Sequence, residues 1–349
     1  MPEPIALWVA PVSNLAGVAR HILDVARVGL PGYRLVVTAP EGPLLEQLRA
    51  MGRPVVPLEV DCSVTDTVRA LRSTVRRLKP VMVHSHLAKA DFLVTMATVG
   101  LAVTLVSTEH HIPEDPLTFH GTRAKALSRQ AAHNARIRRF AALIAVSEST
   151  KRDMLRNWRP TAPITLVRNA VDRIAPASRP PGLRILSLTR LAPEKNLETT
   201  LRTFREVVRS HPEARLTLAG EGSEAIRLQH LARELGVSET VSFPGHVDAA
   251  EAMADHDVLL QPSKADNLSY TLLDAVNAGM GVVASDIGGN PEILPAHCMA
   301  GPDDVAALAA LVIDQGLTPQ RRPQLPPGIP TVEEMANGIV EVYRRSGRR

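Results

Sequence analysis

Aromatic side chains and cysteines are both scarce in this sequence. Phenylalanine, tryptophan and tyrosine together make up 3% of the 349 residues, and the cysteines are Cys62 and Cys298. Proteins that bind single-stranded nucleic acid stack its bases on aromatic rings, so a nucleic-acid partner is not expected. The two cysteines lie far apart, in what we predict are different domains, so a disulfide framework is not expected either. Buried thiols in a reducing cytoplasm fit this composition.

Long hydrophobic runs are also missing. The longest, residues 92–106, is interrupted by three threonines and a glycine. It predicts a helix, a turn and a strand, not a membrane span. The apolar stretch at residues 5–10 has no basic region before it, so we expect a first strand and not a secretory signal. These features predict a cytoplasmic protein.

Charge is unevenly distributed along the chain. The net charge is +4, but residues 1–172 hold 22 basic and 14 acidic residues, whereas residues 173–349 hold 18 and 22. Residues 120–160 alone contain ten arginines or lysines and two acids. A surplus of this kind favours an anionic partner, such as a membrane surface or a phosphorylated molecule; the alternative is a solvated helix face. We expect segment 123–159 to contact the inner face of a membrane or an acceptor.

Short runs of valine, isoleucine and leucine alternate with helical stretches throughout the chain. Such alternation predicts parallel sheets covered by helices. The predicted strands are residues 5–10, 34–38, 55–58, 81–84, 103–107, 143–146, 164–167, 184–188, 215–219, 240–243, 258–261, 281–284 and 297–300.

The length and two proline-rich stretches predict the domain organisation. A chain of this length accommodates two domains that each bury a core. We predict doubly wound α/β domains over residues 1–174 and 183–330, joined by a linker at 175–182. A final segment, 331–349, should form a helix that packs on the N-terminal domain. Sheets of this kind bind ligands beyond the carboxyl ends of their strands. The first strand is followed by a single glycine, Gly17, so a dinucleotide fingerprint is absent and an NAD-dependent oxidoreductase is disfavoured.

The most informative stretch is residues 263–294, where a strand leads through a loop into a helix. Asp266 lies in the loop and Asp274 in the first turns of the helix. Backbone N–H groups at a helix start favour an anion such as a diphosphate, and here they come from Leu268, Ser269 and Tyr270. A second stretch, residues 189–196, places Arg190 and Lys195 directly after a strand, although lysines number only six against 34 arginines. Two cations at that edge favour an anionic ligand.

Residues 263–294 resemble the signature of retaining glycosyltransferases of the family-four type (glycosyl transferases group 1). These enzymes adopt the GT-B fold, an α/β architecture of two Rossmann-like domains that face across a cleft. In the signature an acid is followed by seven residues and a second acid; the family commonly has Glu at both positions, whereas this chain has Asp266 and Asp274. The resemblance implies that Asp266 contacts sugar hydroxyls and Asp274 the ribose diol. It also implies that residues 267–270 (Asn267, Leu268, Ser269 and Tyr270) contact the phosphates and sugar, and that Arg190 and Lys195 contact the diphosphate.

Further motifs follow the family in order. Gly220-Glu221-Gly222 comes after one predicted strand and Phe243-Pro244-Gly245 after another, and Gly288-Gly289 and Glu292 come next. In the first half the match is looser and includes Gly17, His84-Ser85-His86 and Thr108-Glu109-His110-His111. By resemblance, Gly17 and Gly222 belong to the donor site, and His110 hydrogen bonds a donor hydroxyl near the reacting sugar.

The histidines at positions 84, 86, 110 and 111 raise the question of a metal site. No carboxylate or cysteine completes a ligand set that we recognise, so we predict no metal. The family resemblance implies the same for catalysis, because cationic side chains and helix termini neutralise the phosphates. No cofactor is expected beyond the donor substrate, for which a UDP-sugar is favoured and a GDP- or ADP-sugar is possible.

The sequence hypothesis is therefore a metal-independent, retaining hexosyltransferase. It would transfer a hexosyl group from a nucleoside diphosphate sugar to an acceptor hydroxyl in lipid, polysaccharide or small-molecule glycoside synthesis. By resemblance, the leaving diphosphate takes the acceptor proton. Two alternatives remain open: a sugar-nucleotide 2-epimerase of the same fold, and a catalytically silent sugar-nucleotide-binding protein.

Overall fold

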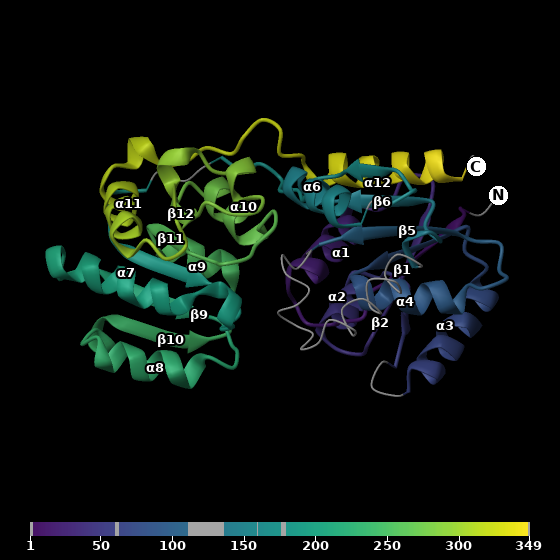
Figure 1. The fold of residues 1–349 in the computed structure, drawn as a ribbon, viewed down its shortest axis with the longest axis horizontal. Coiled ribbons are helices and arrows are strands. Elements are labelled where there is room, and N and C mark those ends of the chain that lie inside the picture. Colours follow the sequence, from purple (N-terminus) through teal and green to yellow (C-terminus); the bar gives the residue numbers. More distant parts are fainter. Residues whose placement is uncertain (1–2, 60–62, 111–135, 159, 176–178, 348–349) are drawn as a thin grey trace. The chain divides into compact units, whose positions relative to one another are not determined.

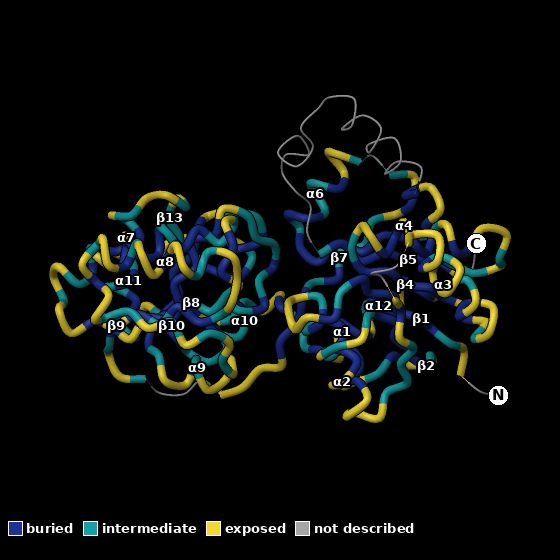
Figure 2. Tube along the Cα trace, turned by 90° about the horizontal axis from the view of Figure 1, so that it is seen from below, coloured by how far each residue is buried: buried dark blue, intermediate teal, exposed yellow. Residues whose placement is uncertain are grey.

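The computed structural model describes residues 3–59, 63–110, 136–158, 160–175 and 179–347. The chain divides into two compact units (Figure 1). The first unit comprises Met1–Ala170 and Pro330–Arg349, and the second comprises Val171–Ile329. Figure 2 shows that buried residues lie along the strands inside each unit, whereas exposed residues lie on the outer helices and loops. Each unit therefore has its own hydrophobic core.

The first unit contains a parallel sheet whose described strands follow the order β3-β2-β1-β4-β5-β6-β7. The order reverses between β1 and β4, as in other doubly wound sheets. The strands are β1 (Ile5–Val9), β2 (Arg34–Ala39), β3 (Val55–Pro57), β4 (Met82–His86), β5 (Thr104–Glu109), β6 (Ala142–Ala145) and β7 (Ile164–Leu166). The described helices of this unit are α1 (Gly17–Val28), α2 (Pro43–Ala50), α3 (Val64–Leu78), α4 (Ala88–Ala97), α6 (Glu148–Asn157) and α12 (Val332–Ser346).

Alternation along β1 explains how this sheet buries both of its faces. Successive side chains of a strand point to opposite faces. Trp8 packs with residues of α1, α2 and α12, whereas Leu7 and Val9 pack with residues of α3 and α4. Because both faces are covered, the strands consist largely of apolar residues, which is the pattern that the sequence displays.

The last helix, α12, belongs to the core of the first unit. It begins with a capping box in which the Thr331 side chain accepts from the Glu334 amide and Glu334 bonds back to Thr331. Tyr343 is fully buried, and its hydroxyl accepts a 2.7 Å hydrogen bond from Nε1 of Trp8. The helix lies along the first unit in Figure 1, where it is drawn in yellow. Burial of its apolar face thus joins the end of the chain to β1.

The second unit repeats the doubly wound plan, with described strands in the order β10-β9-β8-β11-β12-β13, all parallel. These strands are β8 (Arg184–Leu188), β9 (Arg215–Ala219), β10 (Val241–Gly245), β11 (Val258–Gln261), β12 (Gly281–Ser285) and β13 (Met299–Ala300). The described helices are α7 (Leu197–Ser210), α8 (Ala225–Glu234), α9 (Ala249–Asp255), α10 (Tyr270–Asn277) and α11 (Val305–Leu317), with short 3₁₀ turns such as η1 (Pro193–Lys195). The predicted α/β class and the predicted strands are confirmed in both units.

Two details differ from the sequence predictions. The strand predicted at 81–84 extends to His86, so His84, Ser85 and His86 all lie within β4, and all three are buried. The stretch predicted as a linker, 175–182, is bonded to the second unit where it is described. Arg179 donates to the carbonyls of Met253 and His256 at 2.8 and 2.6 Å. These hydrogen bonds tie Arg179 to the second unit.

Two further predictions concern the membrane and the cysteines. Among the described residues, no helix combines the length and the hydrophobicity that crossing a bilayer would require. Cys298 is buried with its thiol free, and burial raises the pKa of this thiol to about 12. It is therefore an inert core residue at neutral pH. Cys62 lies outside the described residues.

Candidate functional site

The loop after β8 carries the predicted cations of the second unit. It runs from Leu188 through η1 to Asn196, whose backbone takes a left-handed conformation. The side-chain amide of Asn196 donates to the carbonyls of Pro262 and Pro302 at 3.1 and 2.8 Å. These bonds tie the loop after β8 to the segments that follow β11 and β13. Asn196 lies in the predicted 189–196 motif, but its bracing role was not predicted.

The loops after β8 and β9 approach each other closely, and glycine makes this possible. A Cβ on Gly220 would lie 1.9 Å from the carbonyl oxygen of Thr189, and one on Gly222 would lie 2.1 Å from that of Leu191. No side chain fits at either position. The predicted donor-site residue Gly222 therefore lies directly against the loop that carries Arg190 and Lys195.

Lys195 and Asp266 form the central polar contact of the second unit. Nζ of Lys195 donates to Oδ2 of Asp266 at 2.9 Å, and their side chains are only 18% and 13% exposed. Nε2 of Gln261 donates to the same oxygen at 2.8 Å and to the Ser269 hydroxyl at 3.2 Å. The backbone N–H of Asn267 donates to Oδ1 of Asp266 at 3.1 Å. The carboxylate is thus held from both sides, and Lys195 is held through it.

Gln261 is a site residue that sequence analysis missed. It is the last residue of β11 and is 5% exposed, yet its amide faces the loop of Asp266. Its signal in the sequence was a polar side chain at the carboxyl end of an otherwise apolar strand, which is where ligand-binding residues of such sheets lie.

Arg190 is arranged differently from Lys195. Its guanidinium forms an ion pair with Glu194, four residues further along the chain, and its side chain is 63% exposed. Exposed pairs of this kind contribute little to stability, so Arg190 can exchange this partner for another anion at small cost. The backbone carbonyl of Glu194 also accepts a 2.8 Å hydrogen bond from the backbone N–H of Lys264.

The start of α10 is where the sequence placed it. The helix begins at Tyr270, and the Ser269 hydroxyl caps it by accepting from the Leu272 amide at 3.4 Å. Asp274 lies in this helix and is half-buried. The loop after β12 packs directly against the loop that contains Asp266, because a Cβ on Gly288 would lie 1.9 Å from the backbone carbonyl oxygen of Asp266. Gly288 has a φ of 51°, which also favours glycine.

In the second unit, then, most of the predicted donor residues lie on neighbouring loops at the carboxyl ends of β8, β9 and β11. Arg190 and Lys195 follow β8, Gly222 follows β9, and residues 266–274 follow β11. Among them, Lys195 and Asp266 are joined by a hydrogen bond between their side chains. The two remaining predicted residues, Gly17 and His110, belong to the first unit.

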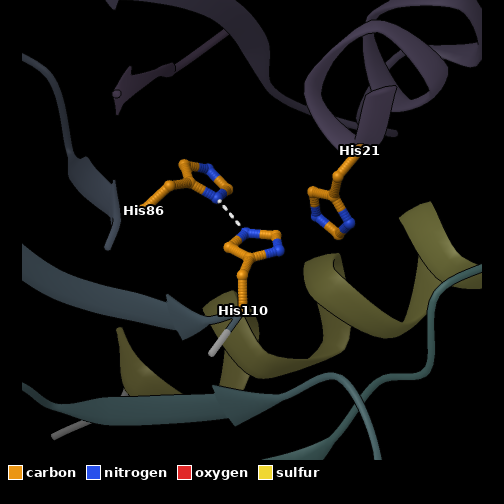
Figure 3. A group of neighbouring side chains, drawn as sticks. All are labelled: His21, His86 and His110. Atoms are coloured by element: carbon orange, nitrogen blue, oxygen red, sulfur yellow. Dashed lines mark hydrogen bonds between the residues drawn. The ribbon is translucent and has the colours of Figure 1, made fainter. Parts of the chain in front are cut away.

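Gly17 and His110 lie at the carboxyl edge of the first sheet. Gly17 is the exposed first residue of α1, and the preceding Ala16 provides no side-chain cap. His110 directly follows β5, and its Nε2 is 3.0 Å from Nδ1 of His86 at the end of β4. His21 of α1 lies beside both rings, with centroid distances of 5.6 Å to His86 and 5.0 Å to His110 (Figure 3). The His111 position lies outside the described residues.

His84 takes part in a separate network behind this cluster. Its Nδ1 is 2.6 Å from the Tyr343 hydroxyl, and its Nε2 is 2.7 Å from the Thr108 hydroxyl. Burial lowers the pKa of His21 to about 4 and lowers those of His84, His86 and His110 well below the usual value for histidine. All four rings are therefore neutral at pH 7, because desolvation disfavours the charged form.

The burial of His21 predicts how the free energy of unfolding changes with pH. Its folded-state pKa lies below the unfolded value of 6.5, so its stabilising contribution is present above pH 6.5 and is lost as the pH falls towards 4. Between pH 7 and pH 5 this group alone should cost about 2 kcal/mol. We expect His21→Gln to lose less unfolding free energy than the unmodified chain over this interval, as measured by urea unfolding. Parallel pH profiles of the two proteins would contradict the assignment.

A buried charged cluster lies beside β4 and β5. Arg136 places Nη2 3.4 Å from Oδ2 of Asp91 and 3.6 Å from Oε1 of Glu109, and all three side chains are at most 3% exposed. Ser85 and Ser107 donate to Oδ1 of Asp91 at 2.6 and 2.9 Å. Burial raises the pKa of Asp91 and raises that of Glu109 well above its usual value. One arginine thus lies beside two buried carboxyls, and burial disfavours the charged form of both.

Both units match models of known protein families. Residues 15–173 match the family model described as Glycosyltransferase Family 4, and residues 182–315 match the one described as Glycosyl transferases group 1. The first match spans most of the first unit and includes Gly17 and His110. The second spans most of the second unit and includes all of the predicted donor residues there.

Individual relatives and solved structures agree with these matches. A glycogen synthase of Mycobacterium tuberculosis is 33% identical over 71% of this chain, which spans 64% of that protein's length. A phosphatidylinositol N-acetylglucosaminyltransferase subunit of Arabidopsis thaliana is 26% identical over 98% of this chain and 80% of its own length. The Anabaena protein Alr3699/HepE, solved with UDP and glucose, superposes with a TM-score of 0.77 at 17% identity, covering 98% of this chain and 97% of its own. At that identity the likeness establishes the fold.

Proposed function

Because this chain belongs to the group 1 glycosyl transferases of the family-four type, we propose that it transfers a hexosyl group from a nucleoside diphosphate sugar to an acceptor hydroxyl, with retention at the anomeric carbon. The observation that carries the proposal is the pair of Lys195 with Asp266 beside the start of α10. It sets a cation, a carboxylate and helix amides side by side, as a donor with both phosphates and hydroxyls requires.

The donor would be held by the loops of the second unit. One N–H of the Lys195 ammonium donates a hydrogen bond to Asp266, and the other two N–H groups would donate to the diphosphate. Arg190 would leave Glu194 and add a second cation. The amides of residues 268–270 would face phosphate oxygens, and the Asp274 carboxylate would accept from the ribose hydroxyls. Positioning and electrostatic stabilisation of the leaving diphosphate then supply the catalysis without a metal at this site.

A UDP-sugar is the donor that we favour. Structural neighbours from Anabaena were solved with UDP and with UDP-glucose. A relative from Mycolicibacterium smegmatis is named as GDP-mannose-dependent, so GDP- and ADP-sugars belong in the same screen. A donor at 100 times its dissociation constant would stabilise the fold by about 2.7 kcal/mol. A thermal-shift screen of the three donor classes tests the proposal, and no shift with any of them would contradict it.

The Lys195→Ala variant provides the sharper test of the site. Its charge matters most when the diphosphate becomes more negative as the sugar leaves, so turnover should fall more than tenfold while donor affinity falls less. Tenfold corresponds to about 1.4 kcal/mol of transition-state stabilisation. Lys264→Ala is the matched control, because Lys264 is a largely exposed lysine of the β11 loop that pairs with Asp303. Near-native turnover in Lys195→Ala would remove the proposed role.

The proposal also includes a contact between the basic segment 123–159 and an acceptor or an anionic membrane. In the basic segment 123–159, residues 123–135 and 159 lie outside the described residues, and Arg136 is buried instead of facing solvent. Arg138, Arg139, Arg152 and Arg156 are exposed and can meet an anionic surface. We expect sedimentation with anionic liposomes at low salt and loss of binding at high salt, because surface charges are screened. Absence of binding at low salt would exclude the membrane version.

Incubation of the donor without acceptor separates the alternatives. A 2-epimerase would convert the sugar nucleotide under these conditions, whereas a transferase would leave it intact or hydrolyse it slowly. A silent binding protein would show the thermal shift with no turnover across a broad panel of acceptors.

A further inference from the structure

Gln261 connects the Asp266 carboxylate to the start of α10. It is the last residue of β11 and is 5% exposed. Its Nε2 lies 2.8 Å from Oδ2 of Asp266 and 3.2 Å from Oγ of Ser269, the residue that caps α10. We propose that Gln261 is a positioning residue, which fixes the Ser269 hydroxyl as a hydrogen-bond donor to a phosphate oxygen of the nucleoside diphosphate. This role rests on the proposed function, in which the diphosphate lies at the start of this helix.

The Asp266 carboxylate determines which way the Gln261 amide points. Oδ2 of Asp266 also takes a 2.9 Å hydrogen bond from Lys195, whose ammonium group only donates, so this oxygen is an acceptor. A glutamine side chain ends in an NH₂ group that donates and an oxygen that accepts. The end that faces Asp266 must therefore be the NH₂ group, because the oxygen there would meet another acceptor. The second N–H of that group is then the one that faces Ser269.

The hydrogen bonds of the Ser269 hydroxyl commit its hydrogen to a ligand. A serine hydroxyl has two lone pairs that accept and one hydrogen that it donates. Nε2 of Gln261 donates to it at 3.2 Å, and the backbone N–H of Leu272 donates to it at 3.4 Å. Both lone pairs are then in use, and within the described part of the chain no group accepts the remaining hydrogen. Because Ser269 is half-buried, a bound ligand can reach that hydrogen.

The surroundings of this hydroxyl favour an anionic oxygen as its acceptor. It lies at the N-terminal end of α10, where backbone N–H groups carry partial positive charge. The Lys195 ammonium belongs to the same chain of hydrogen bonds through Asp266 and Gln261. A hydrogen bond from a hydroxyl to a phosphate oxygen is charge-assisted and therefore stronger than one between neutral groups. A phosphate of the proposed donor thus suits this position better than a sugar hydroxyl does.

The family resemblance leaves this chain of side chains without a role. It assigns the backbone amides of residues 268–270 to the donor, but neither the Ser269 hydroxyl nor Gln261. The positioning role also explains why a buried strand ends in a glutamine. A polar side chain that is 5% exposed needs partners, and here both partners belong to the loop that the donor would contact.

Ser269→Gly tests the phosphate contact. Glycine replaces serine at a helix cap with little loss of stability, so the variant loses the hydroxyl and keeps the fold. Calorimetry with UDP should show about tenfold weaker binding, as the loss of a hydrogen bond to a charged group implies. Ser269→Thr retains a hydroxyl and should bind UDP nearly as the unmodified chain does. Ser63→Gly is the matched control, because it removes the exposed serine cap of α3 in the first unit and should leave UDP affinity unchanged.

Gln261→Leu tests the positioning role. Leucine is similar in size and offers no donor, so the Ser269 hydrogen can turn towards other acceptors. UDP binding should weaken by about two- to tenfold, the range of one neutral hydrogen bond. In the Ser269→Gly background the same substitution should have no further effect, because Gln261 acts through the hydroxyl. A merely structural role would lower the affinity equally in both backgrounds, and that result would overturn the positioning role.

The unmodified chain separates this role from the proposed function. If UDP, GDP and ADP all fail to bind it, the proposed function fails and the role of Gln261 fails with it. If one of them binds, and folded Ser269→Gly binds it as tightly, the phosphate contact is overturned while the proposed function stands. Circular dichroism establishes that each variant is folded. If Gln261→Leu does not fold, Gln261→Met takes its place in the same comparison.

Discussion

Asp274→Ala is expected to weaken the binding of a bare nucleoside diphosphate ten- to a hundredfold. By family resemblance this carboxylate, half-buried in α10, accepts from both ribose hydroxyls. Hydrogen bonds to a charged group contribute about 1.5 to 3 kcal/mol, which corresponds to this range. Calorimetry with UDP, GDP and ADP measures the loss. Asp255→Ala, an exposed aspartate at the end of α9, is the matched control and should bind as the unmodified chain does.

Asp266→Ala should behave differently from Asp274→Ala. Oδ2 of Asp266 accepts from Lys195, so removal of the carboxylate leaves the lysine without its competing anion. The affinity for the bare nucleoside diphosphate should then stay the same or rise. Affinity for the intact sugar nucleotide, or its turnover, should fall, because the sugar hydroxyls lose their acceptor. Equal loss of bare-nucleotide affinity in the two variants would show that the two carboxylates do not divide the donor in this way.

Arg136→Met is expected to destabilise the first unit by about 3 to 5 kcal/mol, the usual cost of removing one partner of a buried ion pair. The reason is that Asp91 and Glu109 share this single guanidinium and are almost fully buried. Urea unfolding measures the loss, and Arg138→Met, at a neighbouring exposed arginine, is the control. Adding Asp91→Asn to Arg136→Met should recover part of the loss, because it removes a charge left without its partner. A loss below about 1 kcal/mol, the range of exposed pairs, would contradict the ion-pair assignment.

The second half of the chain was the more predictable from its sequence. Apolar runs bounded by turn residues identified the strands, and the start of α10 at Tyr270 followed from the strand, loop and helix pattern around Asp266. These features depend on neighbours within a few residues, whose periods of 2 and 3.6 are visible in any sequence. The spacing of Asp266 and Asp274 is a local feature of the same kind, because the two residues lie in one loop and in the helix that directly follows it.

The contacts of individual site residues were less predictable. Lys195 was expected to face a diphosphate, yet its described partner is Asp266, 71 residues further along the chain. That contact depends on β8 and β11 being neighbours in the sheet, an order that no local pattern specifies. Gln261 was missed for the same reason. It appears as the polar end of a strand until the Asp266 loop folds over it.

By itself, the sequence determined two doubly wound α/β units and the family to which the chain belongs, and it predicted the loops that would bind the donor. Local hydrophobic periodicity and short motifs carry that information. The tertiary structure alone decided that His21 joins His86 and His110, that Arg136 is buried between Asp91 and Glu109, and that Trp8 bonds to Tyr343 of α12. These groupings join residues tens to hundreds of positions apart. They exist because strand order and helix packing bring distant side chains into a low-dielectric interior, where each polar group needs a partner.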